Sequence, residues 1–252
     1  MSFVETLFGL NGKTAIVAGG AGVIGTVISK ALLDAGANIV IWSRSQSSVD
    51  KALAALGQDE ARRKRLQGMR VDTGSEQEVA EALTAVVEAF SSPEILVNAV
   101  GGNLGKAPLV ETDMALFQEV LHLNLVAGLM VPTKIVAGYW IANGIKGSII
   151  NLTSMSSYKP VSGVWAYDAA KAGVLNLTVG AANEFARHGI RVNAIAPGFF
   201  LGKQNRALLV DDATGDFTPR GRAVIDHTPY GRFGDPQELI GATLFLASSK
   251  AS

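Results

Sequence analysis

Tyr167 and Lys171 have the residue types and spacing that proton transfer to a substrate oxygen requires. They are four positions apart in a segment of helical periodicity, so both side chains are expected on one face of a helix. None of the other tyrosines has a lysine at this spacing. A phenol with a pKa of about 10 exchanges protons poorly at neutral pH, and a nearby ammonium group lowers that pKa. The pair therefore predicts a general acid for carbonyl reduction and a general base for alcohol oxidation.

A glycine-rich turn follows the first predicted strand, Thr14–Ala18, and opens a predicted helix. It contains Gly20, Gly22 and Gly25 in the pattern G-x-G-x-x-G. Glycines allow the backbone to approach a pyrophosphate, whose charge is stabilised by free N–H groups at the helix N-terminus. The turn therefore predicts a dinucleotide site, although a tight turn without a ligand is the alternative. The expected contacts are Gly19, Gly22, Val23, Ile24 and Gly25.

Ser43 and Arg44 follow the second predicted strand, where a cofactor without a 2′-phosphate normally meets an acidic residue. A guanidinium group binds a phosphate in a bidentate manner, and a hydroxyl group donates to it. These residues therefore favour NADP(H) over NAD(H), with an ordinary surface arginine as the alternative.

Ser154 precedes Tyr167 by thirteen residues and follows a predicted strand at Ser148–Leu152. Ligands bind beyond the carboxyl ends of the strands in open α/β sheets. The Ser154 hydroxyl is therefore expected to hydrogen-bond the substrate oxygen and hold it beside the nicotinamide.

Short apolar runs alternate with helical segments along the chain, which predicts an α/β fold: a doubly wound, Rossmann-type parallel sheet with helices on both faces. No linker or repeat interrupts the pattern, so we expect one domain over residues 1–252, with a substrate lid at about 199–235. The chain stops after a helix, so the usual last strand is expected to be missing. The predicted strands are 14–18, 38–42, 68–71, 95–97, 148–152 and 191–196, and the predicted helices are 24–35, 75–89, 112–138, 165–188 and 236–247, the last with Asp235 as its N-cap.

The composition excludes several functional classes. With 22 basic and 22 acidic residues the net charge is zero, so we expect no nucleic-acid or membrane partner. The chain has no cysteine, which fits a reducing compartment, and we expect a cytoplasmic protein. Residues 121–142 are apolar but contain Asn124 and Lys134, which indicates a buried helix. The three histidines are isolated in the sequence, so no metal site is expected.

Further motifs lie at the ends of other predicted strands and, for Asn124, within the predicted helix at 112–138. In sequence order they are Asp72, Asn98-Ala99-Val100-Gly101, Asn124 and Asn193-Ala194-Ile195-Ala196-Pro197-Gly198. With the residues above, they make the chain resemble the short-chain dehydrogenases/reductases over essentially its whole length. The resemblance implies an NAD(P)-dependent oxidoreductase that acts on a CH–OH group. It also implies a homotetramer, formed through the helices at 112–138 and 165–188, in which a missing last strand would weaken the assembly.

The resemblance implies a role for each motif. Asp72 is expected to meet the adenine amino group, and Asn124 to hold a water that links Lys171 to solvent. The local alternatives are a turn cap at Asp72 and a helix kink at Asn124. The residues implied to line the cofactor are Asn98, Ala99 and Gly101 on the adenosine side and Pro197 and Gly198 beside the nicotinamide.

Some positions depart from the family pattern. Val23 replaces the usual middle glycine of the turn and is expected to narrow the pyrophosphate approach. Ala99 replaces an asparagine that supports neighbouring strands, and Gly202 replaces a threonine. These departures leave open a nucleotide-binding module without catalysis, although Asn124, Ser154, Tyr167 and Lys171 are intact.

The loops at 101–110 and 199–236 are expected to cover the substrate, because loops beyond the strand ends carry specificity in this architecture. They are polar and partly cationic, which favours a hydroxylated acid over a steroid or fatty chain, with ordinary solvated loops as the alternative. Their sequence resembles the sugar-acid branch of the family, of the D-mannonate oxidoreductase or fructuronate reductase type. Gluconate 5-dehydrogenase-like activity, or that of another carbonyl reductase, is the alternative. The predicted substrate-binding residues are Asn103, Ser156, Phe199, Gln204, Asn205 and Arg206.

Overall fold

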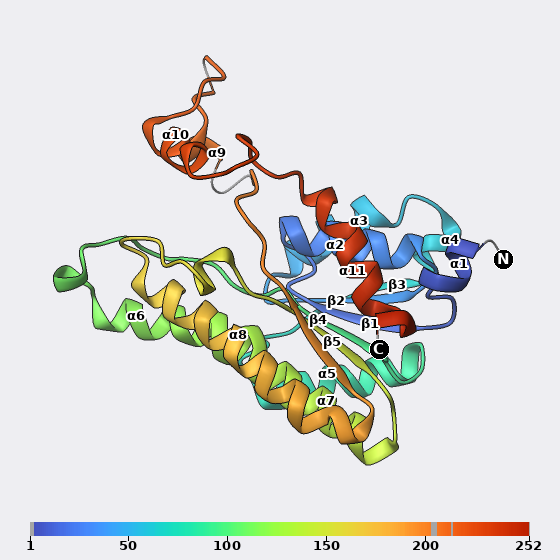
Figure 1. The fold of residues 1–252 in the computed structure, drawn as a ribbon. Helices are drawn as coiled ribbons and strands as arrows, with labels where there is room; N and C mark the ends of the chain where they lie inside the picture. Colours follow the sequence, from blue (N-terminus) through green and yellow to red (C-terminus); the bar gives the residue numbers. More distant parts are fainter. Residues whose placement is uncertain (1–2, 203–205, 213, 252) are drawn as a thin grey trace.

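A parallel sheet of six strands, in the order β3-β2-β1-β4-β5-β6, forms the centre of the protein (Figure 1). The computed structural model describes residues 3–202, 206–212 and 214–251. Each strand lies where the sequence predicted it, with its ends shifted by at most two residues, so the doubly wound α/β fold is confirmed. The strands are β1 (Thr14–Ala18), β2 (Asn38–Ser43), β3 (Leu66–Arg70), β4 (Ile95–Asn98), β5 (Ser148–Leu152) and β6 (Arg191–Ile195).

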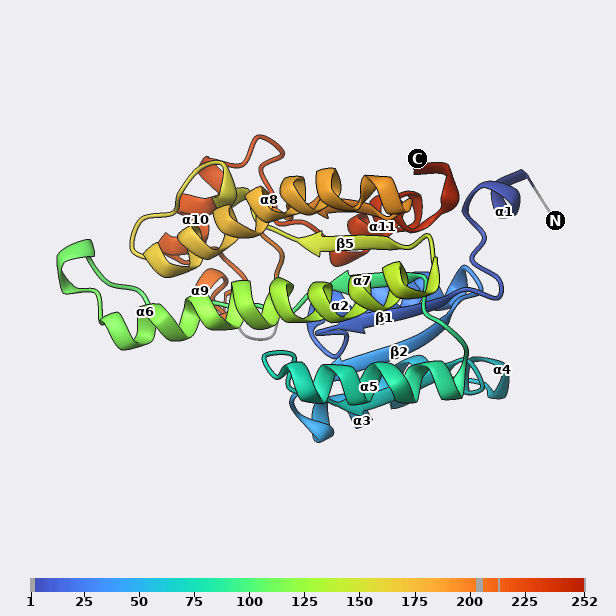
Figure 2. The ribbon, with the colours of Figure 1, turned by 90° about the horizontal axis from the view of Figure 1, so that it is seen from below.

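Helices cover both faces of the sheet (Figures 1 and 2). One face carries α2 (Val23–Asp34), α3 (Gln46–Leu56) and α11 (Ile240–Ala247), and the other carries α5 (Glu76–Ala89), α7 (Val131–Asn143) and α8 (Trp165–Phe185). The sequence analysis missed α3, which begins with Ser45 as N-cap. The short elements are α1 (Phe3–Phe8), α4 (Glu60–Arg63), η1 (Leu109–Glu111), η3 (Met155–Ser157), η4 (Ala186–His188) and η6 (Ser249–Ala251).

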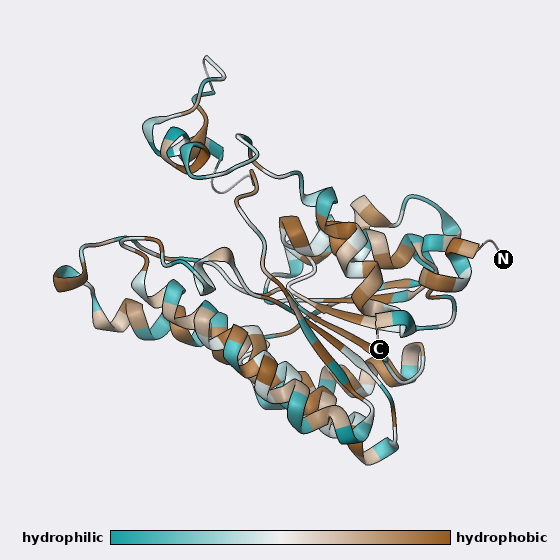
Figure 3. Ribbon diagram, in the orientation of Figure 1, coloured by the Kyte–Doolittle hydropathy of each residue, from teal (hydrophilic) through white to brown (hydrophobic). Residues whose placement is uncertain are grey.

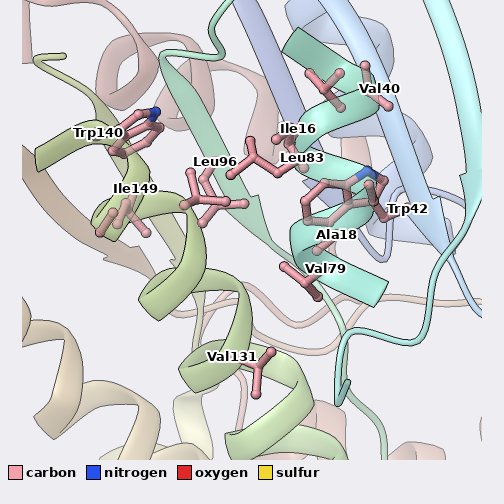
Figure 4. Close-up of a cluster of buried hydrophobic side chains, with 14 of the residues drawn as sticks. Ile16, Ala18, Val40, Trp42, Val79, Leu83, Leu96, Val131, Trp140 and Ile149 are labelled. Carbon is pink, nitrogen blue, oxygen red and sulfur yellow. The ribbon is translucent and has the colours of Figure 1, made fainter. Parts of the chain in front are cut away.

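Alternate strand residues supply the two halves of the core. In β1, Ile16 and Ala18 pack toward α5 and α7, whereas Ala15 and Val17 pack toward α2 (Figure 4). The four inner strands β2, β1, β4 and β5 are hydrophobic along most of their length, as expected for a parallel sheet that is buried on both faces, whereas the edge strands β3 and β6 are mostly only partly buried (Figure 3). Trp140 of α7 is fully buried, and its indole N–H donates to the carbonyl of Pro93 at 2.6 Å.

The predicted helix at 112–138 is longer and less regular than expected. It consists of α6 (Met114–Leu121), a π-helical stretch η2 (His122–Met130) and α7. A π-helix has a wider turn than an α-helix, and such turns occur often at functional sites. Among the described residues, this is the one helix that is long and apolar enough to cross a membrane. More than half of its most apolar stretch of 18 residues is buried inside the protein.

Between β6 and the last helices, residues 206–212 and 214–235 lie away from the sheet (Figure 1). They contain α9 (Arg206–Leu209) and α10 (Pro219–Asp226) and have a small core of Leu209, Val210, Ile225 and Phe233. Asp235 then caps η5 (Pro236–Leu239) in a capping box, so the predicted N-cap is confirmed. No strand follows β6 in the described part of the chain, which leaves β6 at the edge of the sheet.

Candidate active site

Three of the predicted catalytic residues line one cavity at the carboxyl ends of the central strands. The cavity has a volume of about 180 Å³. Ser154 follows β5, and Tyr167 and Lys171 come from the first two turns of α8. Pro197 and Gly198, after β6, form another wall. The helical spacing and the position after the strand therefore bring these side chains together as the sequence predicted.

Lys171 lies beneath the ring of Tyr167. Its side-chain nitrogen Nζ is 5.8 Å from the centroid of the ring and donates to the carbonyl oxygen of Leu152 at 2.8 Å. The residue is only 4% exposed. Burial holds its pKa at about 8, well below the ordinary value of 10.5, because the charged form is poorly solvated there.

The pKa of Tyr167 differs from the sequence-based expectation. We expected the ammonium group of Lys171 to lower it, but burial raises it above its ordinary value of 10.0. The negative charge of Asp168 raises the pKa further, whereas a hydrogen bond with Ser154 lowers it. The expectation was wrong in sign because it weighed the attraction of the neighbouring charge and not the cost of removing the phenolate from water.

The depressed pKa of Lys171 predicts a measurable effect on stability. In the folded protein this lysine releases its proton near pH 8, and in the unfolded chain near 10.5, so the unfolded state holds the extra proton between these values. Stability therefore rises with pH across this window. We expect Lys171→Met to raise the free energy of unfolding at pH 7 by about 3 kcal/mol, and the gain to vanish above pH 10.5. Urea denaturation of both proteins at several pH values tests this, and a gain independent of pH would contradict it.

Asn124 lies in the π-helical stretch and is fully buried. Its amide group donates to the carbonyl oxygens of Gly102 and Val120, at 2.7 and 2.8 Å, and its Oδ1 accepts from the N–H of Gly102 at 3.0 Å. A side chain at Gly101 would meet Asn124 Oδ1 and Lys171 Nζ within 3.1 Å. The role that the structure shows for Asn124 is therefore to hold the 101–102 backbone against Lys171.

The glycine turn has the shape that a pyrophosphate needs. Gly19 has a φ of 79°, which favours glycine, and a side chain there would meet the backbone of Ala99 at 2.7 Å. Gly25 packs against the Gly19 carbonyl with no room for a side chain. Gly22 is the N-cap of α2, and no side chain among the described residues caps its N–H groups. Val23 is 44% exposed, and the expected narrowing of the pyrophosphate approach stays a prediction.

A second cavity, of about 480 Å³, extends from this turn beyond the ends of β1, β2 and β4. Gly22, Ser43 and Arg44 line it, and it shares Ala99, Gly101 and Gly102 with the catalytic cavity. The two cavities adjoin at these three shared residues, an arrangement that fits an extended dinucleotide. The fit is chemical as well, because one end carries the uncompensated helix N-terminus and the Arg44 guanidinium.

Some predicted cofactor residues make other contacts. The carboxylate of Asp72 accepts from the N–H of Gly74 at 2.9 Å, the turn cap that we had kept as an alternative. The amide of Asn98 is buried and donates to Asn151 and Thr133, at 2.9 and 3.0 Å. Asn98 thereby joins β4 to β5. The two strands are therefore linked by a side chain even though Ala99 replaces the asparagine that supports them in the family pattern. Neither Asp72 nor Asn98 lines the cavities described above.

The predicted substrate-binding residues are spread over several places. Asn103 borders the larger cofactor cavity, and Phe199 lines a further cavity that is described below. Ser156 is buried, where its hydroxyl faces Asp168. Arg206 forms an ion pair with Asp212 at 3.3 Å. Gln204 and Asn205 lie outside the described residues.

Asp168 is a site feature that the sequence analysis missed. It is 7% exposed, and it accepts a hydrogen bond from the N–H of Val161 at 3.0 Å. The link joins the loop after β5 to the helix that carries Tyr167. The position next to Tyr167 was the available signal, but an acidic residue in the first turn of a helix usually needs no functional explanation. The described residues contain no group of three or more His, Asp or Glu side chains that could hold a metal ion.

Comparison with known proteins places this geometry in a family. The sequence pattern of the short chain dehydrogenase family (adh_short) matches residues 13–211. A 2-dehydro-3-deoxy-D-gluconate 5-dehydrogenase from Formosa agariphila is 35% identical, and the alignment covers 98% of this chain and 89% of that protein. A gluconate 5-dehydrogenase from Gluconobacter oxydans is 31% identical, and the alignment covers 98% of this chain and 91% of that protein. A galactitol 2-dehydrogenase from Cereibacter sphaeroides is 34% identical, and the alignment covers 98% of this chain and 92% of that protein.

A solved structure agrees with these relatives. It is described as a proposed D-mannonate oxidoreductase from Haemophilus influenzae with bound NAD, and it superimposes with a TM-score of 0.88 at 29% identity, covering 100% of this chain and 93% of that chain. The chain belongs to the short-chain dehydrogenase family. It is therefore an oxidoreductase of a family that uses nicotinamide cofactors, and its resemblance to the sugar-acid branch is confirmed.

Proposed function

We propose that the protein transfers a hydride between NADP(H) and a keto or hydroxy group of a sugar acid of the D-mannonate or fructuronate type. The observation that carries the proposal is the cavity in which Ser154, Tyr167 and Lys171 meet, next to a cradle that fits a dinucleotide. The bound nicotinamide would supply or accept the hydride. The residues that would hold the cofactor are Gly19, Gly22, Val23, Ile24, Gly25, Ser43, Arg44, Ala99, Gly101, Pro197 and Gly198, whereas Asp72 and Asn98 would act only through the turn and the sheet that they hold.

In the reductive direction Tyr167 acts as a general acid. Burial raises the pKa of its phenol, so the hydroxyl is protonated at neutral pH and gives its proton to the substrate oxygen as hydride transfer turns that oxygen into a more basic alkoxide. Ser154, which hydrogen-bonds Tyr167, orients the same oxygen. Lys171 and Asn124 support this pair. The lysine side chain lies next to the Tyr167 ring, and Asn124 fixes the 101–102 backbone that packs against the lysine. In the oxidative direction Tyr167 must lose its proton first, so that rate rises with pH.

The proposed preference for NADP(H) depends on Arg44. The described residues offer its guanidinium no hydrogen-bond or ionic partner, and none of those that line the same cavity is acidic. A 2′-phosphate would provide the missing partner, through charge-assisted hydrogen bonds.

We expect Arg44→Ala to raise the Kd for NADPH by about tenfold or more, because the phosphate loses a hydrogen-bonded charge. The Kd for NADH is expected to change less than twofold, since it has no phosphate at that position. Fluorescence titration with both cofactors measures this. Equal losses for the two would show that Arg44 does not select the phosphate.

The test of the proposed reaction is NADPH oxidation with a panel of keto acids, including fructuronate and 5-ketogluconate, and with uncharged ketoses for comparison. We expect turnover with at least one acid. Absence of turnover with every carbonyl, from folded protein that binds the cofactor, would overturn the proposal. A second candidate is gluconate 5-dehydrogenase activity, which the relative from Gluconobacter oxydans favours. Gluconate-dependent reduction of NADP identifies it.

We also propose a homo-oligomer, a tetramer, that uses the long helix and α8. These helices lie side by side on one face of the protein (Figure 2), and contacts between α6 and α8 join them. Exposed apolar residues on these two helices support an interface there. Light scattering decides the assembly, and a stable monomer would contradict it. The exposed apolar residues of the two helices are Met114, Val126, Met130, Ile141 and Val179.

The cytoplasmic location remains a prediction.

A further inference from the structure

A third cavity, of about 490 Å³, adjoins the catalytic one and is strongly basic. Four separate segments build it: the loop after β4, the loop after β5, Phe199 after β6, and α10 with the residues that follow it. Lys106, Lys159 and Arg220 line it, together with His227, and none of its described lining residues is acidic. The rest of its wall is largely apolar. In a chain with equal numbers of acidic and basic residues, this is a marked local excess of positive charge.

The three cations have no ionic or hydrogen-bond partner among the described residues. Several other surface cations do have partners: Lys134 bonds Glu76 at 2.7 Å, and Arg206 pairs with Asp212. Clustered cations repel one another unless an anion lies between them. The cavity therefore has the charge of a site for an anionic group.

Backbone contacts hold Lys106 in this wall. A side chain at Gly163, whose φ is 85°, would meet the Lys106 side chain at 2.8 Å, so the lysine stem packs directly on the glycine. Beside it the N–H of Ala107 donates to the Gly163 carbonyl at 3.0 Å, and the indole of Trp165 donates to the Ala107 carbonyl at 3.0 Å. Lys106 is thus tied to the start of the helix that carries Tyr167.

The two cavities are neighbours along two chain segments. Ser154 lines the catalytic cavity and Met155 the basic one, and the same division separates Gly198 from Phe199. In a six-carbon sugar acid that reacts at carbon 5, the carboxylate is four carbon–carbon bonds away, about 5 Å in an extended chain. In the arrangement proposed below, the reacting carbon lies in the catalytic cavity and the carboxylate in the basic one.

We propose that the basic cavity binds the carboxylate of the substrate, and that Lys106 and Arg220 determine the preference for a sugar acid over the uncharged polyol of the same configuration. This inference rests on the proposed function and deepens it. By this inference the charge of the substrate distinguishes this chain from relatives of similar sequence identity. The galactitol dehydrogenase, for example, is named for a substrate without a charge.

The test uses two matched pairs of alcohols: D-gluconate with D-glucitol, and D-mannonate with D-mannitol. The wild-type protein and the variants Lys106→Met and Arg220→Met are compared, with Lys51→Met on the remote helix α3 as control. We expect each cavity variant to raise KM for the acid at least tenfold with little change in kcat, and to leave the polyol reaction unchanged. The wild-type KM for the acid should rise with salt more steeply than that of the variants.

Calorimetry with the cofactor-loaded protein provides a second measurement that does not need turnover. Binding of the acids but not the polyols, lost in both cavity variants, supports the inference even if the proposed reaction fails. Turnover of acid and polyol with equal kcat/KM would overturn the inference and leave the proposed reaction standing. The inference would also be overturned if Lys106→Met and Arg220→Met lowered kcat/KM equally for the acid and the polyol of a pair. Absence of acid binding by the wild-type protein would overturn it as well.

Discussion

Tyr167→Phe is expected to lower kcat by about 10²- to 10⁴-fold in either direction while the Kd for the cofactor stays within twofold. The change removes the hydroxyl that transfers the proton and keeps the ring that packs above Lys171. The catalytic cavity therefore keeps its shape, and the loss falls on the chemical step. Steady-state kinetics and cofactor titration on the same preparation separate the two effects.

A matched tyrosine provides the control. The Tyr139 hydroxyl in α7 is hydrogen-bonded to Ser92 at 2.8 Å, remote from all three cavities. Tyr139→Phe removes the same atom and is expected to leave kcat unchanged. If Tyr167→Phe retained full activity, another group would be the proton donor, and the assignment of the active site would be wrong.

Gly25→Ala is expected to abolish measurable cofactor binding and to destabilise the protein by about 1–3 kcal/mol. A methyl group there would overlap the Gly19 carbonyl and lie 2.8 Å from the Cα of Gly20, so the turn and the first turn of α2 must move apart. The N–H groups that would bind the pyrophosphate then lose their alignment. Calorimetric titration with NADPH and urea denaturation measure the two effects.

Gly138→Ala is the control for the helix position. Gly138 is also within a helix, but nothing lies within 4 Å of the place where its side chain would be. Alanine has the higher helix propensity, so this variant is expected to gain up to about 1 kcal/mol of stability and to bind the cofactor normally. Normal cofactor binding by Gly25→Ala would show that the turn does not hold the pyrophosphate.

The sheet and the catalytic trio were predictable because each is encoded locally. A buried parallel strand is a short apolar run between polar turns, as at Ser148–Leu152, and a spacing of four on a helix places two side chains together whatever surrounds them. Ser154 was found because its position after a strand determines where it lies. None of these inferences required knowledge of distant contacts.

Other features depend on packing between distant segments and were hidden. The amide of Asn98 serves the sheet because Asn151 of β5 lies opposite, a pairing that only the register of the strands reveals. The sign of the pKa shift at Tyr167 depends on how completely the fold excludes water from the phenol. The two loops are visibly cationic in the sequence, but only the fold shows that Lys106 and Arg220, more than a hundred positions apart, line one cavity.

Because the long helix contains the wide π-helical turn η2, the number of residues in it determines how the two ends of the helix are oriented relative to each other. Each residue of an α-helix advances the side-chain direction by about 100°. Deleting a single residue from η2 would re-phase the two ends of the helix, so that Asn124 and the buried face of α7 could no longer point inward together. Natural variation in this stretch should therefore consist of substitutions, whereas insertions and deletions should accumulate in the outer loops.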